Sequence, residues 1–486
     1  MEESRRDFIK KTGLAAVGAG VLMTGMSGRV EAKKDMLDLK VINGTLFIPG
    51  VGLVKSGVGV KSGKIAVIAP DDLLPEAKKV VNAGGHFVIP GIFDPHWHLG
   101  IFHPYKGEIE TETRNALANG ITTIGVYLGV PDAYTDFLPD GISMGNDFSS
   151  TDFMLFPSVF HNKHLDEMEA CNDKFGVTGF KFFMNDSGIP GKGFYPAVPD
   201  DVIRVGLRKI KAMKGGTAGG HCENQKMVSE GRKIFAKIAN PTLQDWGNSS
   251  PAGAEAEASG RFVGMLREVG VRGYLVHTSS RESVELLADL FKNGRDDIYV
   301  ETTAAYLGMT WDDPMGRYAK MLPPIRGNDA QEALWKAVKS GVVNTIGTDN
   351  VSNTLADKGT DMHNSNPGFP IAGDHLALIL TEGYHKRGIP WTTIIEKATK
   401  TPAKAFGVYP RKGTIAVGSD ADLVILDLNK EKVVNPKTHL SYSDYSLFQG
   451  RRLKGWAVQV IKGGQVVVAD GKVLSSPGIG KYITAT

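Results

Sequence analysis

The sequence predicts an α/β protein: a (β/α)8 barrel of the TIM type that carries a small β-sandwich domain built from both ends of the chain. Two observations lead to this prediction. Eight apolar, strand-like runs alternate with helical stretches in the middle of the chain, a pattern typical of parallel strands joined by crossover helices. The segments before and after this region contain short alternating runs broken by glycine, which are typical of β-hairpins.

The composition is that of an ordinary globular protein. Hydrophobic residues make up 42% and charged residues 22% of the 486 residues, and no apolar run is long enough for a membrane span, which excludes a polytopic membrane protein and a disordered chain. The net charge is only +3, so we expect no nucleic-acid partner. Two cysteines, Cys171 and Cys222, are too few for a disulfide framework.

Residues 1–32 have the features of an export signal. A charged segment with Arg5 and Arg6 precedes a mildly apolar stretch from Gly13 to Met26 and a small-residue cleavage site. The apolar stretch is shorter than the roughly 20 residues of a membrane helix, so we expect no stable membrane span. The paired arginines resemble the bacterial twin-arginine signal, which implies recognition by that export machinery and a periplasmic protein. The alternative is an amphipathic N-terminal helix with two chance arginines.

The rest of the chain divides into three segments. Residues 33–86 and 407–486 are expected to form the two parts of the β-sandwich, and residues 87–406 the barrel. A doubly wound open sheet is the competing fold, but no G-x-G-x-x-G motif follows any of the strand-like runs. The eight expected barrel strands are Phe87 to Phe93, Ile121 to Tyr127, Phe153 to Phe160, Gly179 to Met184, Thr217 to His221, Gly273 to His277, Ile298 to Thr302 and Val343 to Gly347.

Histidines and one aspartate stand at the ends of several expected strands. His96 and His98 have an i, i+2 spacing, which places both imidazoles on one face of an extended segment. His221, His277 and Asp349 end three further strands. Barrel active sites are built at the C-terminal ends of the strands, so we expect these side chains to share one rim. Taken singly, a strand-end histidine is more often a hydrogen-bonded structural residue, and an aspartate can simply cap a helix.

Lys181 stands in the fourth expected strand between Phe180 and Phe182. Removing an ammonium from water in such surroundings is costly, so we expect its pKa to fall and its amine to become neutral. A neutral buried lysine beside metal ions can take up CO2, and the resulting carbamate offers two oxygens that bridge two divalent cations. The alternative is a lysine that extends to solvent or pairs with a carboxylate.

These residues, together with several motifs in the same order, resemble the amidohydrolase superfamily, specifically its hydantoinase, dihydropyrimidinase and allantoinase branch. The resemblance covers nearly the whole chain after the leader. The motifs that carry it are His96-Trp97-His98, Gly179-Phe180-Lys181, His221-Cys222-Glu223-Asn224, Val276-His277-Thr278-Ser279-Ser280, Glu301 to Leu307, Pro323-Pro324-Ile325-Arg326, Gly347-Thr348-Asp349 and Tyr409 to Leu423.

The resemblance implies a binuclear metal site, a cyclic amide substrate and a homotetramer. The implied ligands of two divalent ions, usually zinc, are His96, His98 and Asp349 for one ion, His221 and His277 for the other, and a carboxylated Lys181 that bridges them. A hydroxide shared by the two ions would open a hydantoin or dihydropyrimidine ring, with Asp349 as general base and then general acid. Glu223 and Asn224 are expected to orient His221 or to cap the next helix.

Three positions depart from the pattern of this family. Many hydantoinases have a tyrosine five residues after the bridging lysine, but that position is Asp186 here, and allantoinases also lack the tyrosine. Leu322 replaces the usual serine before the Pro-Pro pair and is expected to bind substrate through its backbone, with Asn366 as a second backbone anchor. Asn350 follows Asp349 where histidine is common, so the surroundings of Asp349 are expected to differ.

Two alternatives to a hydantoinase or dihydropyrimidinase remain open. The first is an allantoinase or a hydrolase of another lactam or imide, because the altered segment after Lys181 does not select one ring. The second is a non-catalytic scaffold of the same fold, like the collapsin response mediator proteins, which have lost metal ligands. All six ligand positions are filled in this sequence, which favours the enzyme.

Overall fold

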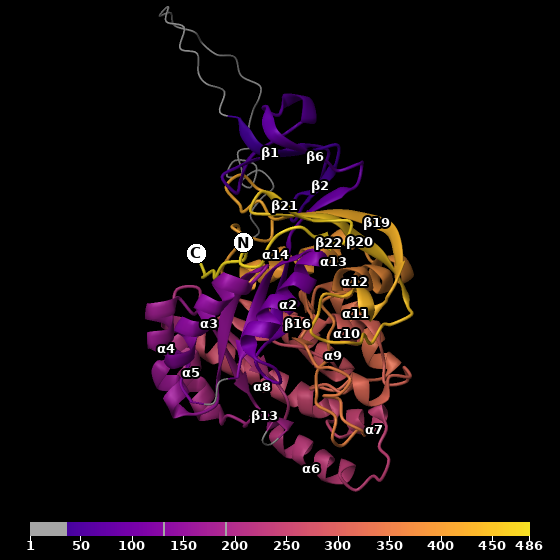
Figure 1. The fold of residues 1–486 in the computed structure, drawn as a ribbon. Helices are drawn as coiled ribbons and strands as arrows, with labels where there is room; N and C mark the ends of the chain where they lie inside the picture. Colours follow the sequence, from indigo (N-terminus) through magenta and orange to yellow (C-terminus); the bar gives the residue numbers. More distant parts are fainter. Residues whose placement is uncertain (1–35, 130–131, 190–191) are drawn as a thin grey trace, which may run out of the picture.

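The computed structural model describes residues 36–129, 132–189 and 192–486. The predicted export signal lies outside these residues. Strands from the two ends of the chain lie together on one side of a larger body surrounded by helices (Figure 1). Within the described ranges, none of the helices combines the length and the hydropathy needed to cross a bilayer.

The larger body is a barrel of parallel strands. Its sheet has the order β17-β16-β15-β14-β11-β10-β9-β8-β18, and every neighbouring pair is parallel. The strands are β8 (Ile92–His98), β9 (Ile121–Leu128), β10 (Asp152–Val159), β11 (Gly179–Phe183), β14 (Thr217–His221), β15 (Gly273–Leu275), β16 (Ile298–Thr303), β17 (Thr345–Gly347) and β18 (Asn350–Val351).

The two edge strands of this sheet are consecutive pieces of one strand. Thr345–Gly347 pairs with β16, whereas Asn350–Val351 pairs with β8. The chain therefore crosses from one edge to the other through Thr348 and Asp349. A sheet whose first and last members belong to one continuous segment is closed, so the predicted (β/α)8 barrel is confirmed.

The barrel strands are buried on both faces. Every residue of β9 and β10 is buried, as expected when side chains fill the interior and helices cover the outside. The covering helices are α2 (Tyr105–Ala118), α3 (Tyr134–Phe148), α4 (Asn162–Phe175), α5 (Asp200–Ala212), α8 (Ala252–Val269), α9 (Arg281–Leu290) and α11 (Asn328–Ser340), followed by α12 (His375–Ile379), the π-helical turn Leu380–Lys386, α13 (Trp391–Lys397) and α14 (Lys400–Ala405).

Shorter elements occupy the loops that follow the strands. They are the hairpin β12 (Ser187–Ile189) and β13 (Lys192–Tyr195), the helices α6 (Gln225–Phe235), α7 (Leu243–Asn248) and α10 (Ala304–Gly308), and the 3-10 turn Gly316–Ala319. The side chain of Asn224 accepts a hydrogen bond from Met227 N and so caps α6, as the sequence predicted. These loops surround the C-terminal end of the barrel.

The second body is a β-sandwich with one core. Its two sheets have the orders β5-β4-β1-β6 and β22-β21-β20-β19-β7-β2-β3. Leu39 and Val60 from the first sheet share a buried cluster with Val88 and Ile461 from the second, which confirms a sandwich built from both chain ends. The strands are β1 (Leu37–Ile42), β2 (Thr45–Ile48), β3 (Gly52–Val54), β4 (Gly57–Lys61), β5 (Lys64–Ala69), β6 (Ala77–Asn82), β7 (Phe87–Pro90), β19 (Leu423–Val433), β20 (Arg452–Lys462), β21 (Gln465–Ala469) and β22 (Lys472–Val473).

The expected first barrel strand, Phe87 to Phe93, divides at Gly91. Phe87–Pro90 pairs with β2 and β19 in the sandwich, whereas Ile92–His98 pairs with β9 in the barrel. Both pieces are apolar and extended, so local composition does not show where one sheet ends and the next begins. The barrel strand that carries the two histidines therefore begins later than predicted.

The C-terminal residues close the N-terminal end of the barrel. The backbone of Phe153, at the start of β10, bonds to Lys481 O at 3.0 Å and Ile483 N at 2.9 Å. Ile483 is buried in the same cluster as Phe156 and Phe406. The tail thus seals the barrel at the end away from the strand-end histidines.

A buried ionic cluster joins the sandwich, the barrel and this tail. Lys412 Nζ lies 2.6 Å from Asp422 and 2.9 Å from Asp420, and it also pairs with Asp152 at the start of β10. Lys462 Nζ, from β20, contacts the other oxygen of Asp152 at 2.6 Å. Charges buried in this way need mutual pairing to be tolerated, and here each one has a partner.

Candidate metal centre

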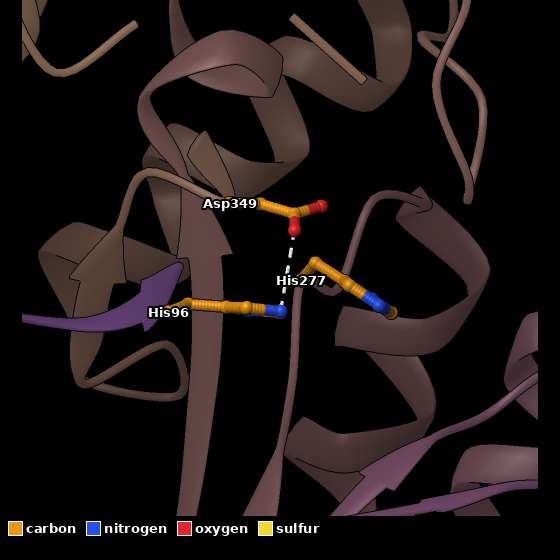
Figure 2. Close-up of side chains that lie close together, drawn as sticks. All are labelled: His96, His277 and Asp349. Carbon is orange, nitrogen blue, oxygen red and sulfur yellow. Dashed lines mark ion pairs between the residues drawn. The ribbon is translucent and has the colours of Figure 1, made fainter. Parts of the chain in front are cut away.

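The first group of predicted ligands gathers around Asp349. Its Oδ1 lies 3.2 Å from Nε2 of His96 and 3.2 Å from Nε2 of His98. Lys181 Nζ lies 3.1 Å from the same nitrogen of His96. Figure 2 shows the carboxylate of Asp349 facing the His96 imidazole.

The second group consists of His221 and His277. Nδ1 of His221 lies 2.9 Å from Nε2 of His277. The ligand atoms of His96, His277 and Asp349 all lie within 4.8 Å of one another, so His277 links the two groups (Figure 2). Two nitrogens on one tetrahedral zinc are about 3.3 Å apart. The spacings of 2.9–3.2 Å between ligand atoms therefore fit cations held by these residues.

Two carboxylates set which histidine nitrogens face the cluster. Nδ1 of His96 contacts Glu301 at 2.7 Å, and Nε2 of His221 contacts Glu223 at 2.8 Å. A proton donated outward leaves the lone pair of the other ring nitrogen directed into the cluster. Glu223 was predicted for this role but Glu301, which also accepts the backbone N–H of His277 at 2.9 Å, was not. The signal for Glu301 in the sequence was an acidic residue within the expected strand Ile298 to Thr302.

Burial also sets the protonation of the ligands. It is the main cause that lowers the pKa of His96 to about 3 and that of His98 to about 4, so both imidazoles are neutral near pH 7. Burial opposes ionisation of Asp349, but His96, His98 and Lys181 outweigh it and hold the pKa of this carboxyl below its usual range. The aspartate is therefore ionised, and the imidazoles carry free lone pairs.

Lys181 follows neither alternative considered for it. Its side chain is only 1% exposed and so does not extend to solvent. Among the described residues, no carboxylate oxygen lies within 4.0 Å of Lys181 Nζ, which is the distance limit for a salt bridge. Burial lowers the pKa of this amine to about 8, so a neutral form is accessible near neutral pH.

Two of the six residues have strained backbones. His277 has φ 40° and Asp349 has φ 56°, in the left-handed region that residues with side chains seldom adopt. Each follows a barrel strand, and the backbone N–H of His277 is held by Glu301. Such strain is concentrated at functional sites, where the surrounding contacts maintain it.

Asn350 fixes the segment that carries Asp349. Its Oδ1 accepts two backbone N–H groups from the loop before α12 at 2.9 and 3.1 Å, and its Nδ2 donates to Glu112 of α2 at 3.1 Å. On the other side, Asp94 accepts the backbone N–H of Thr348 at 3.0 Å. The asparagine thus anchors the segment that carries Asp349, at the position where the resemblance leads one to expect histidine.

A cavity opens onto the cluster. Its polar wall includes five of the predicted ligands, His98, Lys181, His221, His277 and Asp349. The apolar part of the lining consists of Ile101, Phe102, Phe183, Met321, Leu322 and Val351. A small ring can therefore lie against the ligands while an apolar substituent contacts the walls.

The two predicted substrate anchors have different positions. Leu322 lines the cavity as expected. Asn366 does not belong to the lining, although the next two residues do, and its carbonyl oxygen accepts a hydrogen bond from Lys358 Nζ at 2.6 Å. A carbonyl oxygen can accept a second hydrogen bond, so the role of Asn366 as a substrate anchor stays a prediction.

Comparison with known proteins agrees with the fold and the site. The model of the amidohydrolase family matches residues 87–467, and the chain belongs to this family. It is 31% identical over 460 residues to an L-hydantoinase of Paenarthrobacter aurescens, covering 92% of this chain and 98% of that protein. It is 29% identical over 464 residues to an allantoinase of Solibacter usitatus, with coverage of 92% and 98%.

Comparison with solved structures supports an assignment to one branch of the amidohydrolase family. A solved structure of L-hydantoinase (dihydropyrimidinase) from Arthrobacter aurescens matches with a TM-score of 0.87 and 31% identity, over 92% of this chain and all of that one. Within the amidohydrolases, the protein therefore belongs to the branch of hydantoinases, dihydropyrimidinases and allantoinases.

Proposed function

We propose that the protein is a hydrolase that opens a C–N bond of a cyclic amide of the hydantoin or dihydropyrimidine type. The observation that carries this proposal is the gathering of six proposed ligand side chains, contributed by five barrel strands or the residues just after them, five of which line one cavity. Four of them are His96, Lys181, His221 and His277, each at most 2% exposed. The relatives named hydantoinase act on this class of ring by name, and they match nearly the whole chain.

The donor set suits two divalent cations, which we propose to be zinc because imidazole and carboxylate ligands predominate. We also propose that Lys181 carries a CO2-derived carbamate, which its buried, unpaired amine favours. Two cations bound there would make water a nucleophile near neutral pH and polarise the ring carbonyl. Asp349, held ionised, accepts the proton and returns it to the departing amide nitrogen. The product is a ring-opened carbamoyl or ureido acid.

Allantoin hydrolysis is the second candidate. It is favoured by Asp186, which stands where many hydantoinases have tyrosine, and by the allantoinases among the relatives. The apolar walls of the cavity favour a ring with an apolar substituent over the polar ureido group of allantoin. Substrate preference therefore separates the two candidates.

The test is a substrate panel with purified, metal-replete protein. Hydantoins, dihydrouracil, allantoin and simple lactams are compared by kcat/KM, with Asp349→Asn as the inactive control. We expect turnover of hydantoin or dihydrouracil and loss of roughly 10²- to 10⁴-fold in the variant. Turnover of allantoin alone would select the second candidate. No turnover of any ring, together with a protein that binds no metal, would support the non-catalytic scaffold.

We further propose export to the periplasm through the twin-arginine pathway and assembly as a homotetramer. The first rests on Arg5 and Arg6 before the mildly apolar stretch, and the second on the family resemblance. Replacing both arginines with lysine should abolish periplasmic accumulation, as measured by cell fractionation. Light scattering of the mature protein should give four times the chain mass, and a monomer would contradict the tetramer.

A further inference from the structure

A small hairpin follows the strand of Lys181 and contributes two hydroxyl-bearing side chains to the lining of the cavity. Ser187 in β12 and Tyr195 in β13 are direct cross-strand partners. Partners of this kind place their side chains on the same face of the ribbon. Both residues line the cavity that opens onto the metal ligands.

The ring of Tyr195 is held by aromatic stacking. It stacks on Phe183 with ring centres 5.0 Å apart and on Phe160 at 5.3 Å. Phe183 in turn stacks on the imidazole of His221 at 5.0 Å. The phenol is thus fixed next to a proposed metal ligand by two ring contacts.

The hydroxyl of Tyr195 has no partner among the described residues. It lies against Gly129, directly after β9, where a Cβ atom would come within 2.6 Å of the hydroxyl and 2.4 Å of the ring. The absence of a side chain at Gly129 therefore makes the room that this tyrosine occupies. A hydroxyl without a protein partner on the wall of a cavity is available to a ligand.

Ser187 is also able to donate. Its Oγ lies 3.3 Å from Nε2 of His221, but that nitrogen makes a shorter contact of 2.8 Å with Glu223. Since the histidine directs its proton mainly to the carboxylate, the serine O–H is free to turn toward the cavity.

Asp186, which stands where many hydantoinases have tyrosine, cannot take this role. Its carboxylate accepts hydrogen bonds from Ala197 N at 2.9 Å and Gln225 Nε2 at 2.6 Å, and it is exposed. An ionised carboxylate has no proton to donate. We infer that Tyr195, assisted by Ser187, donates hydrogen bonds to the carbonyl oxygen of the cyclic amide as its C–N bond opens. This inference rests on the proposed function.

Steady-state kinetics of metal-replete variants test the inference, with the ring that wild type turns over fastest as the probe. Negative charge develops on the carbonyl oxygen in the transition state, and loss of one donor to it costs about 10²-fold in kcat. We therefore expect a loss of that size for Tyr195→Phe, a smaller loss for Ser187→Ala, and KM changes of at most a few-fold. Tyr299→Phe is the matched control, because Tyr299 lies at the start of β16, away from the C-terminal strand ends where the proposed ligands gather. It should retain wild-type kcat.

A double-mutant cycle separates this role from a structural one. Gly129→Ala displaces the Tyr195 ring without removing its hydroxyl, so it should lower kcat in wild type but add little in the Tyr195→Phe background. Bound metal and the thermal midpoint of Tyr195→Phe should equal those of wild type. A Tyr195→Phe variant with wild-type kcat would overturn the inference alone, whereas a wild type inactive on every ring would overturn the proposed function and the inference together.

Discussion

The barrel buries two lysines at opposite ends, in opposite surroundings. Lys181, at the C-terminal end of the strands, faces imidazoles, and burial lowers its pKa to about 8. Lys412, at the other end, contacts Asp152, Asp420 and Asp422. Burial alone would lower the pKa of Lys412, but the three carboxylates raise it above the usual lysine value.

Depth of burial therefore does not decide what a lysine does. The charges around the amine decide it, because an unpaired ammonium loses its proton in an apolar site while a paired one keeps it. Lys412 is a permanent cation that links the barrel, through Asp152, to the segment of Asp420 and Asp422 that leads into the sandwich. Lys181 is an amine with an accessible neutral form, which is the form that the proposed reaction with CO2 requires.

Replacement of Lys181 should have the largest effect. In Lys181→Ala we expect the metal content to fall from about two ions per chain to one or none, and kcat/KM to fall by roughly 10³-fold or more, since the two ions supply several kcal/mol of transition-state stabilisation. Elemental analysis and kinetics measure both changes. Lys181→Arg should behave alike, because a guanidinium stays protonated and forms no carbamate. Two ions retained in Lys181→Ala would contradict the bridging role.

Removing a carboxylate at the other end should affect stability and leave the chemistry intact. Asp152→Asn leaves Lys412 and Lys462 short of one counter-charge, and breaking a buried pair costs about 3–5 kcal/mol of unfolding free energy. Denaturant unfolding measures this, and kcat of the folded variant should be unchanged. Glu169→Gln, in an exposed pair with Lys209, is the control and should change little. An unchanged free energy of unfolding in Asp152→Asn would show that the cluster does not stabilise the protein.

The free-energy difference of unfolding between wild type and Asp152→Asn should also depend on pH. Burial raises the pKa of Asp152, but Lys412 and Lys462 outweigh it and hold the pKa below the usual range. Stability from a depressed carboxyl pKa is fully present above about pH 5 and is lost as the pH falls through the folded-state value. Wild type and Asp152→Asn should therefore differ most near neutral pH and converge in strong acid. A constant difference across this range would contradict the assignment.

Loss of an orienting carboxylate should have the smallest effect. Glu301→Gln weakens the hydrogen bond that directs the His96 lone pair inward, and such changes typically weaken metal binding by 10- to 100-fold. Competition with a chelator measures the affinity. Glu285→Gln, which is exposed on α9, is the control. An unchanged affinity would show that Glu301 does not set the histidine tautomer.

The barrel and the clustering of the six proposed ligand residues could be predicted because each depends on local pattern. Eight apolar runs give eight strands, and polar residues at their C-terminal ends must meet at one rim. Lys181 was recognisable as unusual because phenylalanines flank it. The sandwich followed from the similar patterns at both chain ends.

The remaining features depend on contacts between distant residues. Phe87–Pro90 looks like a barrel strand, but its partners in β2 and β19 place it in the sandwich. The hydrogen bond from Lys358 Nζ to the carbonyl of Asn366 is not revealed by any spacing in the sequence. Tyr195 reaches the cavity only because the hairpin folds back beside Ser187. Such pairings are set by tertiary packing and leave no periodic signal.

The division of the eighth strand ties catalysis to the architecture. Residues 345–347 pair with β16 and residues 350–351 pair with β8, so Thr348 and Asp349 lie where the barrel closes. If these two pairings separate, the Asp349 carboxylate moves away from the imidazoles of His96 and His98, even while the outer helices stay folded. Under the proposed mechanism, turnover of substrate is therefore a more sensitive measure of an intact barrel than helix content.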